Sequence, residues 1–168
     1  MTLKTIPVVA VLLTACQSTQ SHDPSLLSFR MPDGSTLTLN KALEIPAGST
    51  HALLQSGELT TESEANLYEV SCRLDLKAFG PRTIEPEEFR IYRTEDGQRR
   101  VSDAGIWAFF SEIHLDSDKG TDVIMLRCSS WGYGMHWHFS VADMQTALGD
   151  YFTFTYPQNK TLDKGSQS

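Results

Sequence analysis

Residues 68–78 constrain the fold most, because their side chains alternate between two kinds. The even positions hold Tyr, Val, Cys, Leu, Leu and Ala, and the odd positions hold Glu, Ser, Arg, Asp and Lys. An extended strand points successive side chains to opposite faces, whereas a helix would spread these residues around its circumference. We therefore expect a strand with one dry face and one solvated face, and we expect Cys72 on the dry face.

The rest of the body also predicts short strands separated by turns. Pro32-Asp33-Gly34 and Glu95-Asp96-Gly97 are turn sequences, and each predicts a hairpin. Residues 106–115 and 123–128 are apolar at nearly every position, which is typical of central strands covered on both faces. Besides the alternating segment, the expected strands are residues 26–31, 35–39, 89–93, 99–102, 106–115, 123–128 and 151–156.

One helix is predicted late in the chain, over about residues 141–148. Ser140 is suited to the N-cap and Asp143 follows three residues later, which is close to a capping box. Apolar residues then recur at i, i+3 and i+7, and Gly149 ends the pattern. The predicted fold is mainly β, an antiparallel β-sandwich or partly open barrel with one short C-terminal helix.

The first residues of the chain predict export. Lys4 precedes an apolar run over residues 6–13, which is too short to cross a bilayer as a helix. The ending Leu13-Thr14-Ala15-Cys16 resembles the lipobox of bacterial lipoproteins. That resemblance implies a signal peptide over residues 1–15 and lipidation of Cys16. The alternative is an ordinary signal peptide whose cleavage site adjoins a cysteine.

The remaining chain divides into a tether, a domain and a tail. Residues 16–25 are polar after the cysteine and without periodicity, which is typical of a flexible tether. Residues 26–156 contain the expected strands and helix and predict a single β-rich domain. Residues 157–168 are polar and predict a disordered tail.

The body also resembles small lipoproteins of Gram-negative bacteria. The segments that carry this resemblance are Glu44–Gly48, Tyr68–Cys72, Glu85–Phe89 and Leu126–Cys128. The resemblance supports the location and a disulfide, and it transfers no activity and no functional residue. In such lipoproteins the residue after the lipidated cysteine influences sorting, and Gln17 in place of Asp implies the outer membrane, with the domain in the periplasm.

The two cysteines that follow Cys16 predict a disulfide in the domain. With Cys16 assigned to lipid, Cys72 and Cys128 form an even pair in an exported chain, which predicts a disulfide. The alternative is two reactive or metal-binding thiols, but no Cys-x-x-Cys pattern favours it.

The formal net charge of −7 argues against nucleic acid and against adhesion of the protein surface to anionic headgroups. The expected partners are the membrane, through the lipid, and another envelope protein.

A histidine pair is the main candidate for a metal site. His136 and His138 would project from one face of an extended segment, as in a two-histidine chelate. His114 is the third candidate donor, with Asp116, Asp118 or Met125 to complete the site. The other interpretation places Trp137 and Phe139 in the core and both histidines at the surface. Because the spacing supplies only two of the three or four ligands that zinc needs, we expect no tightly bound metal and no cofactor.

Catalytic and calcium-binding motifs are weak. Residues 116–122 are rich in Asp, but they lack the glycine order and the bidentate Glu of an EF-hand and predict a polar hairpin turn. No Gly-x-Ser-x-Gly motif is present, and a thiol nucleophile would require the cysteines of the expected disulfide. We therefore expect no enzyme but a binding or envelope-assembly module. The alternatives are a periplasmic metal-binding protein that uses His136 and His138, and a small hydrolase.

Overall fold

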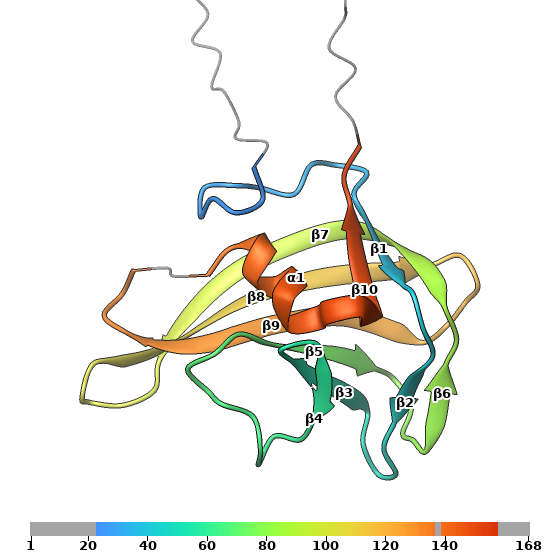
Figure 1. Cartoon of the computed structure of the whole chain (residues 1–168), viewed down its shortest axis with the longest axis horizontal. Helices are drawn as coiled ribbons and strands as arrows, with labels where there is room; N and C mark the ends of the chain where they lie inside the picture. Colours follow the sequence, from blue (N-terminus) through green and yellow to red (C-terminus); the bar gives the residue numbers. More distant parts are fainter. Residues whose placement is uncertain (1–22, 137–138, 158–168) are drawn as a thin grey trace, which may run out of the picture.

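Ten strands, one α-helix and one short 3-10 helix follow one another along the described chain (Figure 1). A computed structural model describes residues 23–136 and 139–157. The elements are β1 (Thr36–Leu39), β2 (Leu43–Ile45), β3 (His51–Gln55), β4 (Glu58–Thr60), β5 (Ser71–Leu76), β6 (Arg82–Ile84), β7 (Glu87–Arg100), β8 (Ile106–Ser117), β9 (Val123–Tyr133), α1 (Val141–Leu148), η1 (Gly149–Tyr151) and β10 (Phe152–Thr155).

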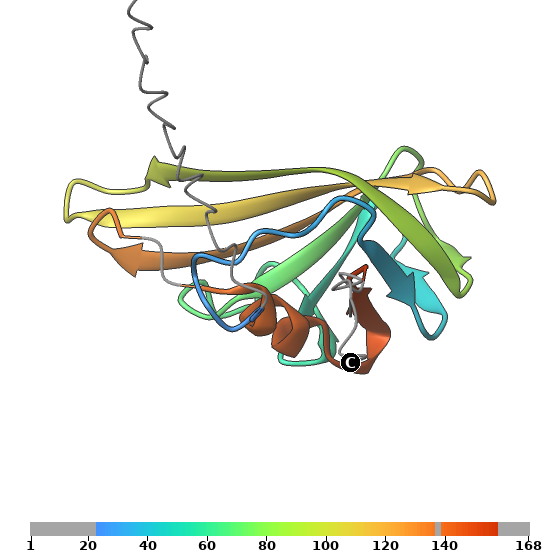
Figure 2. The same cartoon turned by 90° about the horizontal axis from the view of Figure 1, so that it is seen from above.

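Eight of these strands form one curled antiparallel sheet, in the order β10-β1-β7-β8-β9-β5-β3-β4. Strands β2 and β6 pair separately. The sheet bends into a half-barrel around α1, so that the helix lies on its inner face (Figure 2). This architecture confirms the predicted mainly β fold, with antiparallel strands and one C-terminal helix.

Helix α1 begins and ends where the sequence predicts. The Ser140 hydroxyl accepts a hydrogen bond from the Asp143 backbone N–H at 3.3 Å, and the Asp143 carboxylate accepts one from the Ser140 N–H at 2.7 Å. The carbonyl of Pro24 accepts a hydrogen bond from Ala142 N–H at 3.0 Å, so another N–H of the first helical turn is satisfied. Gly149 ends the helix with φ 54°, a conformation that favours glycine.

The core lies between the inner face of the sheet and α1. Phe89, Phe109 and Phe152 are fully buried there, together with the aliphatic side chains of β5 and β9. In β5 the pattern alternates as predicted, and Cys72 is completely buried. The structure contains a disulfide between Cys72 and Cys128, which lie directly opposite each other on β5 and β9 with Cα atoms 4.0 Å apart.

One predicted strand is wrong, and another is shorter than predicted. Residues 26–31 form turns and irregular chain instead of a strand, and only the Pro32–Gly34 turn precedes β1. Phe29 is nevertheless buried, and its ring meets that of Tyr156 edge-on at 5.2 Å. The alternating segment also pairs over a shorter length than predicted, because Tyr68 lies in the turn before β5 and is 47% exposed.

The hairpin predicted at Glu95-Asp96-Gly97 is also wrong, because β7 continues through these residues. Gly97 lies directly opposite Phe110 on β8, and a Cβ at Gly97 would collide with the Phe110 ring. The glycine therefore accommodates an aromatic ring on the neighbouring strand instead of forming a turn. Strands β8 and β9 are longer than predicted, and their side chains alternate between buried and half-buried positions instead of being covered on both faces.

Candidate functional site

A groove with a volume of about 510 Å³ crosses the outer face of the sheet, opposite to α1. Its floor comes from five adjacent strands, β7, β8, β9, β5 and β3, and the chain around residues 62–67 adds to its lining. The apolar part of the lining consists of Leu53, Ala65, Leu67, Ala108, Phe110 and Trp131. Since these side chains are distributed over strands distant in sequence, only the folded sheet brings them together.

A row of charged side chains runs across the same outer face. Glu95 on β7 lies opposite Glu112 on β8, Glu112 lies opposite Arg127 on β9, and Arg127 lies opposite Arg73 on β5. Like charges placed directly opposite each other on antiparallel strands are destabilising. The row contains two such pairs, the acidic pair Glu95–Glu112 and the basic pair Arg73–Arg127. Only the basic pair lies in the groove.

Neighbouring carboxylates partly neutralise the two groove arginines. Arg73 forms an ion pair with Asp75 at 2.8 Å and reaches Glu62 at 3.6 Å. Arg127 lies 3.5 Å from a Glu112 oxygen, and its guanidinium sits 4.5 Å above the centre of the Phe110 ring. Each arginine side chain is about one-third exposed, so both remain open to the groove.

The groove lining contains more basic than acidic side chains, although the chain is acidic. Arg73, Arg99 and Arg127 line it, whereas Glu62 is its only acidic lining residue in the described part of the chain. Arg99 forms no ion pair within residues 23–136 and 139–157. The whole chain carries a formal net charge of −7, so three arginines in one lining are a local concentration of basic side chains.

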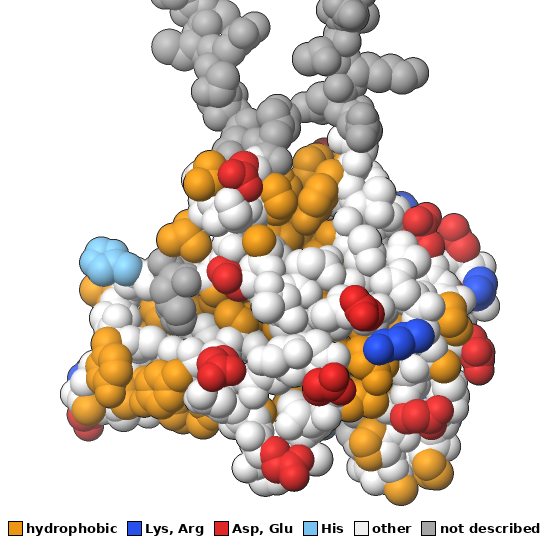
Figure 3. Space-filling model, viewed as in Figure 1, with side chains coloured by type: hydrophobic (Ala, Val, Ile, Leu, Met, Phe, Trp, Pro, Cys, Tyr) orange, Lys and Arg blue, Asp and Glu red, His pale blue; other side chains and the backbone are white. Residues whose placement is uncertain are grey.

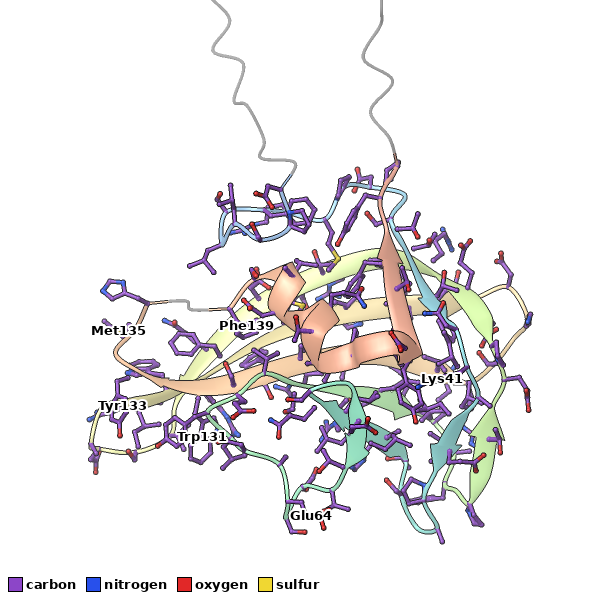
Figure 4. All side chains as sticks on the ribbon, viewed as in Figure 1. Lys41, Glu64, Trp131, Tyr133, Met135 and Phe139 are labelled. Carbon is purple, nitrogen blue, oxygen red and sulfur yellow. A yellow bond between two sulfur atoms is a disulfide. The ribbon has the colours of Figure 1, made fainter. Side chains whose placement is uncertain are left out.

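An aromatic cluster lies at one end of the groove. The Trp131 ring meets Tyr68 edge-on at 6.1 Å, and Tyr68 stacks with Tyr133 at 6.2 Å. Tyr133 is 75% exposed, and hydrophobic side chains gather on the side of the molecule where Trp131 and Tyr133 are labelled (Figures 3 and 4). Desolvation, and secondarily the nearby Tyr133 phenol, raises the pKa of Tyr68 above its ordinary value. The cluster therefore offers neutral aromatic surface beside the arginines.

The acidic end of the row includes a histidine. Oxygen atoms of Glu95 and Glu112 and a ring nitrogen of His114 lie within 4.8 Å of one another. Arg93 also pairs with Glu95, and this hydrogen bond lowers the pKa of the Glu95 carboxyl below its ordinary value. Because Arg93 and Arg127 each face one of the two carboxylates, the group is an ion-pair network in which cations are already present.

The histidines named from the sequence are not brought together as far as the structure describes them. His138 lies outside the described residues, and His136 is exposed in the turn after β9. His114 lies opposite Met125, whereas β9 ends near His136 at Tyr133, opposite Ile106. Eight residues separate His114 from Ile106 along β8, a distance of about 26 Å in a strand. His114 is therefore no partner for His136.

The other sequence candidates that the structure describes are in turns, ion pairs or the disulfide. Cys16 lies outside the described residues. Asp116 lies near the end of β8 and pairs with Arg90. Asp118 lies in the turn between β8 and β9, so the predicted polar hairpin turn is present but begins after Ser117. Both cysteines of the domain are joined to each other, so neither offers a free thiol.

Comparison with known proteins gives no relative: no family model, no curated protein sequence and no solved structure matches the chain. Among the helices formed by the described residues, none combines the length and the apolar character needed to cross a membrane.

Proposed function

We propose that this protein is an outer-membrane lipoprotein, anchored through Cys16, whose periplasmic domain is a non-enzymatic binding module. The single observation that carries the binding role is the groove on the outer face of the sheet. Its volume of about 510 Å³ falls within the range of about 300–1,000 Å³ that is typical of small-molecule sites. Its apolar lining suits a ligand with an apolar body, and its few charged groups would orient that ligand.

The anchor rests on the lipobox-like ending Leu13-Thr14-Ala15-Cys16. One acyl chain holds a protein to a membrane only weakly, whereas several chains hold it firmly. The Cys16→Ala protein should therefore take up no fatty acid and should leave the membrane fraction, while Ser21→Ala, in the same polar segment, should behave as the native chain. Fatty-acid labelling followed by membrane fractionation measures both, and a labelled, membrane-bound Cys16→Ala protein would refute the anchor.

The binding role can be tested with a neutral apolar dye, N-phenyl-1-naphthylamine. Ala108 lies on the groove floor, so Ala108→Trp should fill the groove and abolish saturable dye fluorescence. Ala78 is exposed and lies outside the groove, which makes Ala78→Trp the matched control. Thermal denaturation checks that both variants are folded. No saturable binding to the native domain, or equal binding by the folded Ala108→Trp variant, would refute the groove as the site.

A further inference from the structure

We infer that the groove selects an amphipathic anion, with Arg73 and Arg127 binding the anionic headgroup and the apolar lining holding a single chain. The headgroup is a carboxylate or a phosphate. This inference rests on the proposed function, because it names the ligand class of the same groove.

The basic pair is the first observation behind this inference. Arg73 and Arg127 are directly opposite each other on β5 and β9, and both line the groove. Two guanidinium groups in this position repel each other, which is unfavourable for the unliganded fold. An anion between them would replace this repulsion with two attractions, and a carboxylate or phosphate matches the planar donor geometry of arginine.

The donors needed for this contact remain available. A guanidinium has five N–H donors, and the one ion pair of Arg127, with Glu112, is a long contact of 3.5 Å. Arg73 directs its Nε and Nη2 at Asp75, so its Nη1, which faces Glu62 at 3.6 Å, is the group that a ligand would contact. The Phe110 ring supports Arg127 from one side and holds it on the groove floor. Arg99 adds a third positive charge to the lining. Because the arginines are only about one-third exposed, water and salt screen them less than they screen fully exposed charges.

Glu62 already brings a carboxylate to this pair. Its side chain is 68% exposed and lies 3.6 Å from Arg73 and 3.5 Å from His51. The approach of Glu62 demonstrates that a carboxylate can reach Arg73 from the groove lining. A ligand headgroup would compete with Glu62 for Arg73, so removing the Glu62 charge should strengthen anion binding.

The shape of the groove accounts for the apolar part of the ligand. From β3 to β7 the floor crosses four inter-strand spacings of about 4.8 Å, or about 19 Å in all. Leu53 and Trp131 lie in this lining, together with Ala108. The basic pair on β5 and β9 would hold the charged headgroup, and a single alkyl chain would lie along the apolar lining beside it.

Four probes that share one alkyl chain test the inference by displacement of the neutral dye. They are decanoate, decyl phosphate, decanol and decyltrimethylammonium. Decanoate, decyl phosphate or both should displace the dye at concentrations roughly tenfold or more below decanol, as expected for charge-assisted hydrogen bonds. Decyltrimethylammonium should be weakest. The carboxylate and phosphate arms distinguish a free fatty acid from a lipid phosphate as the source of the headgroup.

Three variants of the domain separate charge recognition from general packing. Arg127→Gln should remove the preference for the anions, so that decanoate and decyl phosphate lose far more affinity than decanol does. Glu62→Gln should increase anion affinity, which is an outcome that a loss of folding cannot produce. Lys41→Gln removes one positive charge outside the groove, beside Tyr151, and should change nothing (Figure 4).

The outcomes distinguish this inference from the proposed function. If the dye binds in the groove but decanol competes as well as decanoate and decyl phosphate, the anion inference is overturned and the binding module stands. A preference that survives in Arg127→Gln, or an anion affinity that falls in Glu62→Gln, also overturns it. If neither the dye nor any decyl probe binds, the binding module itself is overturned.

Discussion

Arg73 and Arg127 face each other across β5 and β9, one position along from the disulfide between Cys72 and Cys128. The two cross-strand pairs project from opposite faces of the sheet, because successive residues in a strand alternate in direction. The covalent pair lies in the core, and the basic pair lies in the groove. The disulfide therefore fixes the register that holds two like charges opposite each other.

Removing the disulfide should destabilise the domain and weaken ligand binding in the groove. For the double variant Cys72→Ala, Cys128→Ala we expect the free energy of unfolding to fall by about 2–5 kcal/mol, as for other small exported domains. Urea denaturation measures this loss.

Mass spectrometry under non-reducing conditions should show the native domain lacking two hydrogens relative to its reduced form. Two free thiols in protein made in an oxidising compartment would contradict the bridge.

Gly97 should tolerate no larger side chain, because the Phe110 ring covers it. Gly97→Val should cost about 1–3 kcal/mol through overpacking. It should also weaken dye binding, since the Phe110 ring that it displaces lines the groove. The double variant Gly97→Val, Phe110→Ala should recover part of the overpacking cost, and a double-mutant cycle measures this coupling. Strictly additive losses would show that the ring does not restrict Gly97.

Loss of the N-cap of α1 should lower the free energy of unfolding by only a small amount. Ser140→Ala removes the hydroxyl that accepts from the Asp143 N–H, so we expect a loss of about 1 kcal/mol. Thr146→Ala is the control, because Thr146 is exposed later in α1. Chemical denaturation followed by circular dichroism compares the two variants. Equal stability of Ser140→Ala and the native domain would contradict the role of the cap.

Local sequence signals predicted those elements whose cause is local. The Ser140 and Asp143 pair defines the start of α1, because both partners lie within one helical turn. The alternation of β5 predicts the inward direction of Cys72 for the same reason. The turn predicted at Gly97 is wrong because the residue that decides its conformation, Phe110, is on another strand. A turn-like triplet cannot reveal a ring that packs on it from a distance in sequence.

The groove could not be predicted, because it depends on register and strand order. Nothing near Arg73 in the sequence indicates that Arg127 lies opposite, and pairing Glu95 with Glu112 likewise requires the register of β7 and β8. The odd positions of the alternating segment did predict that Arg73 lies on the solvated face. They did not predict that five strands assemble that face into one groove.

Alkaline pH should destabilise the domain through Tyr156. Burial raises the pKa of the Tyr156 phenol to about 12. The unfolded chain loses this proton near the ordinary tyrosine pKa of about 10, so between these values the folded state binds more protons than the unfolded state. The stability that Tyr156 contributes is therefore present below about pH 10 and is lost as the pH rises towards about 12.

A Tyr156→Phe variant isolates this contribution. It should lose less stability than the native domain between about pH 10 and pH 12, because no phenol titrates at this position. Tyr92→Phe, at an exposed tyrosine, is the matched control. Thermal denaturation across this pH range measures the difference. Parallel curves for native and Tyr156→Phe domains would contradict the assignment.

The cluster of Glu95, Glu112 and His114 should bind no metal tightly in the native domain. Three donors at this spacing resemble an open zinc site, but Arg93 and Arg127 already place positive charge against both carboxylates. Elemental analysis after incubation with zinc and copper, followed by desalting, should find well under one metal per chain. Replacing Arg93 by Gln removes one competing charge and should raise zinc affinity. If the native domain holds one metal per chain and His114→Ala loses it, this cluster is a metal site. If His136→Ala loses it instead, the result supports a site built on His136.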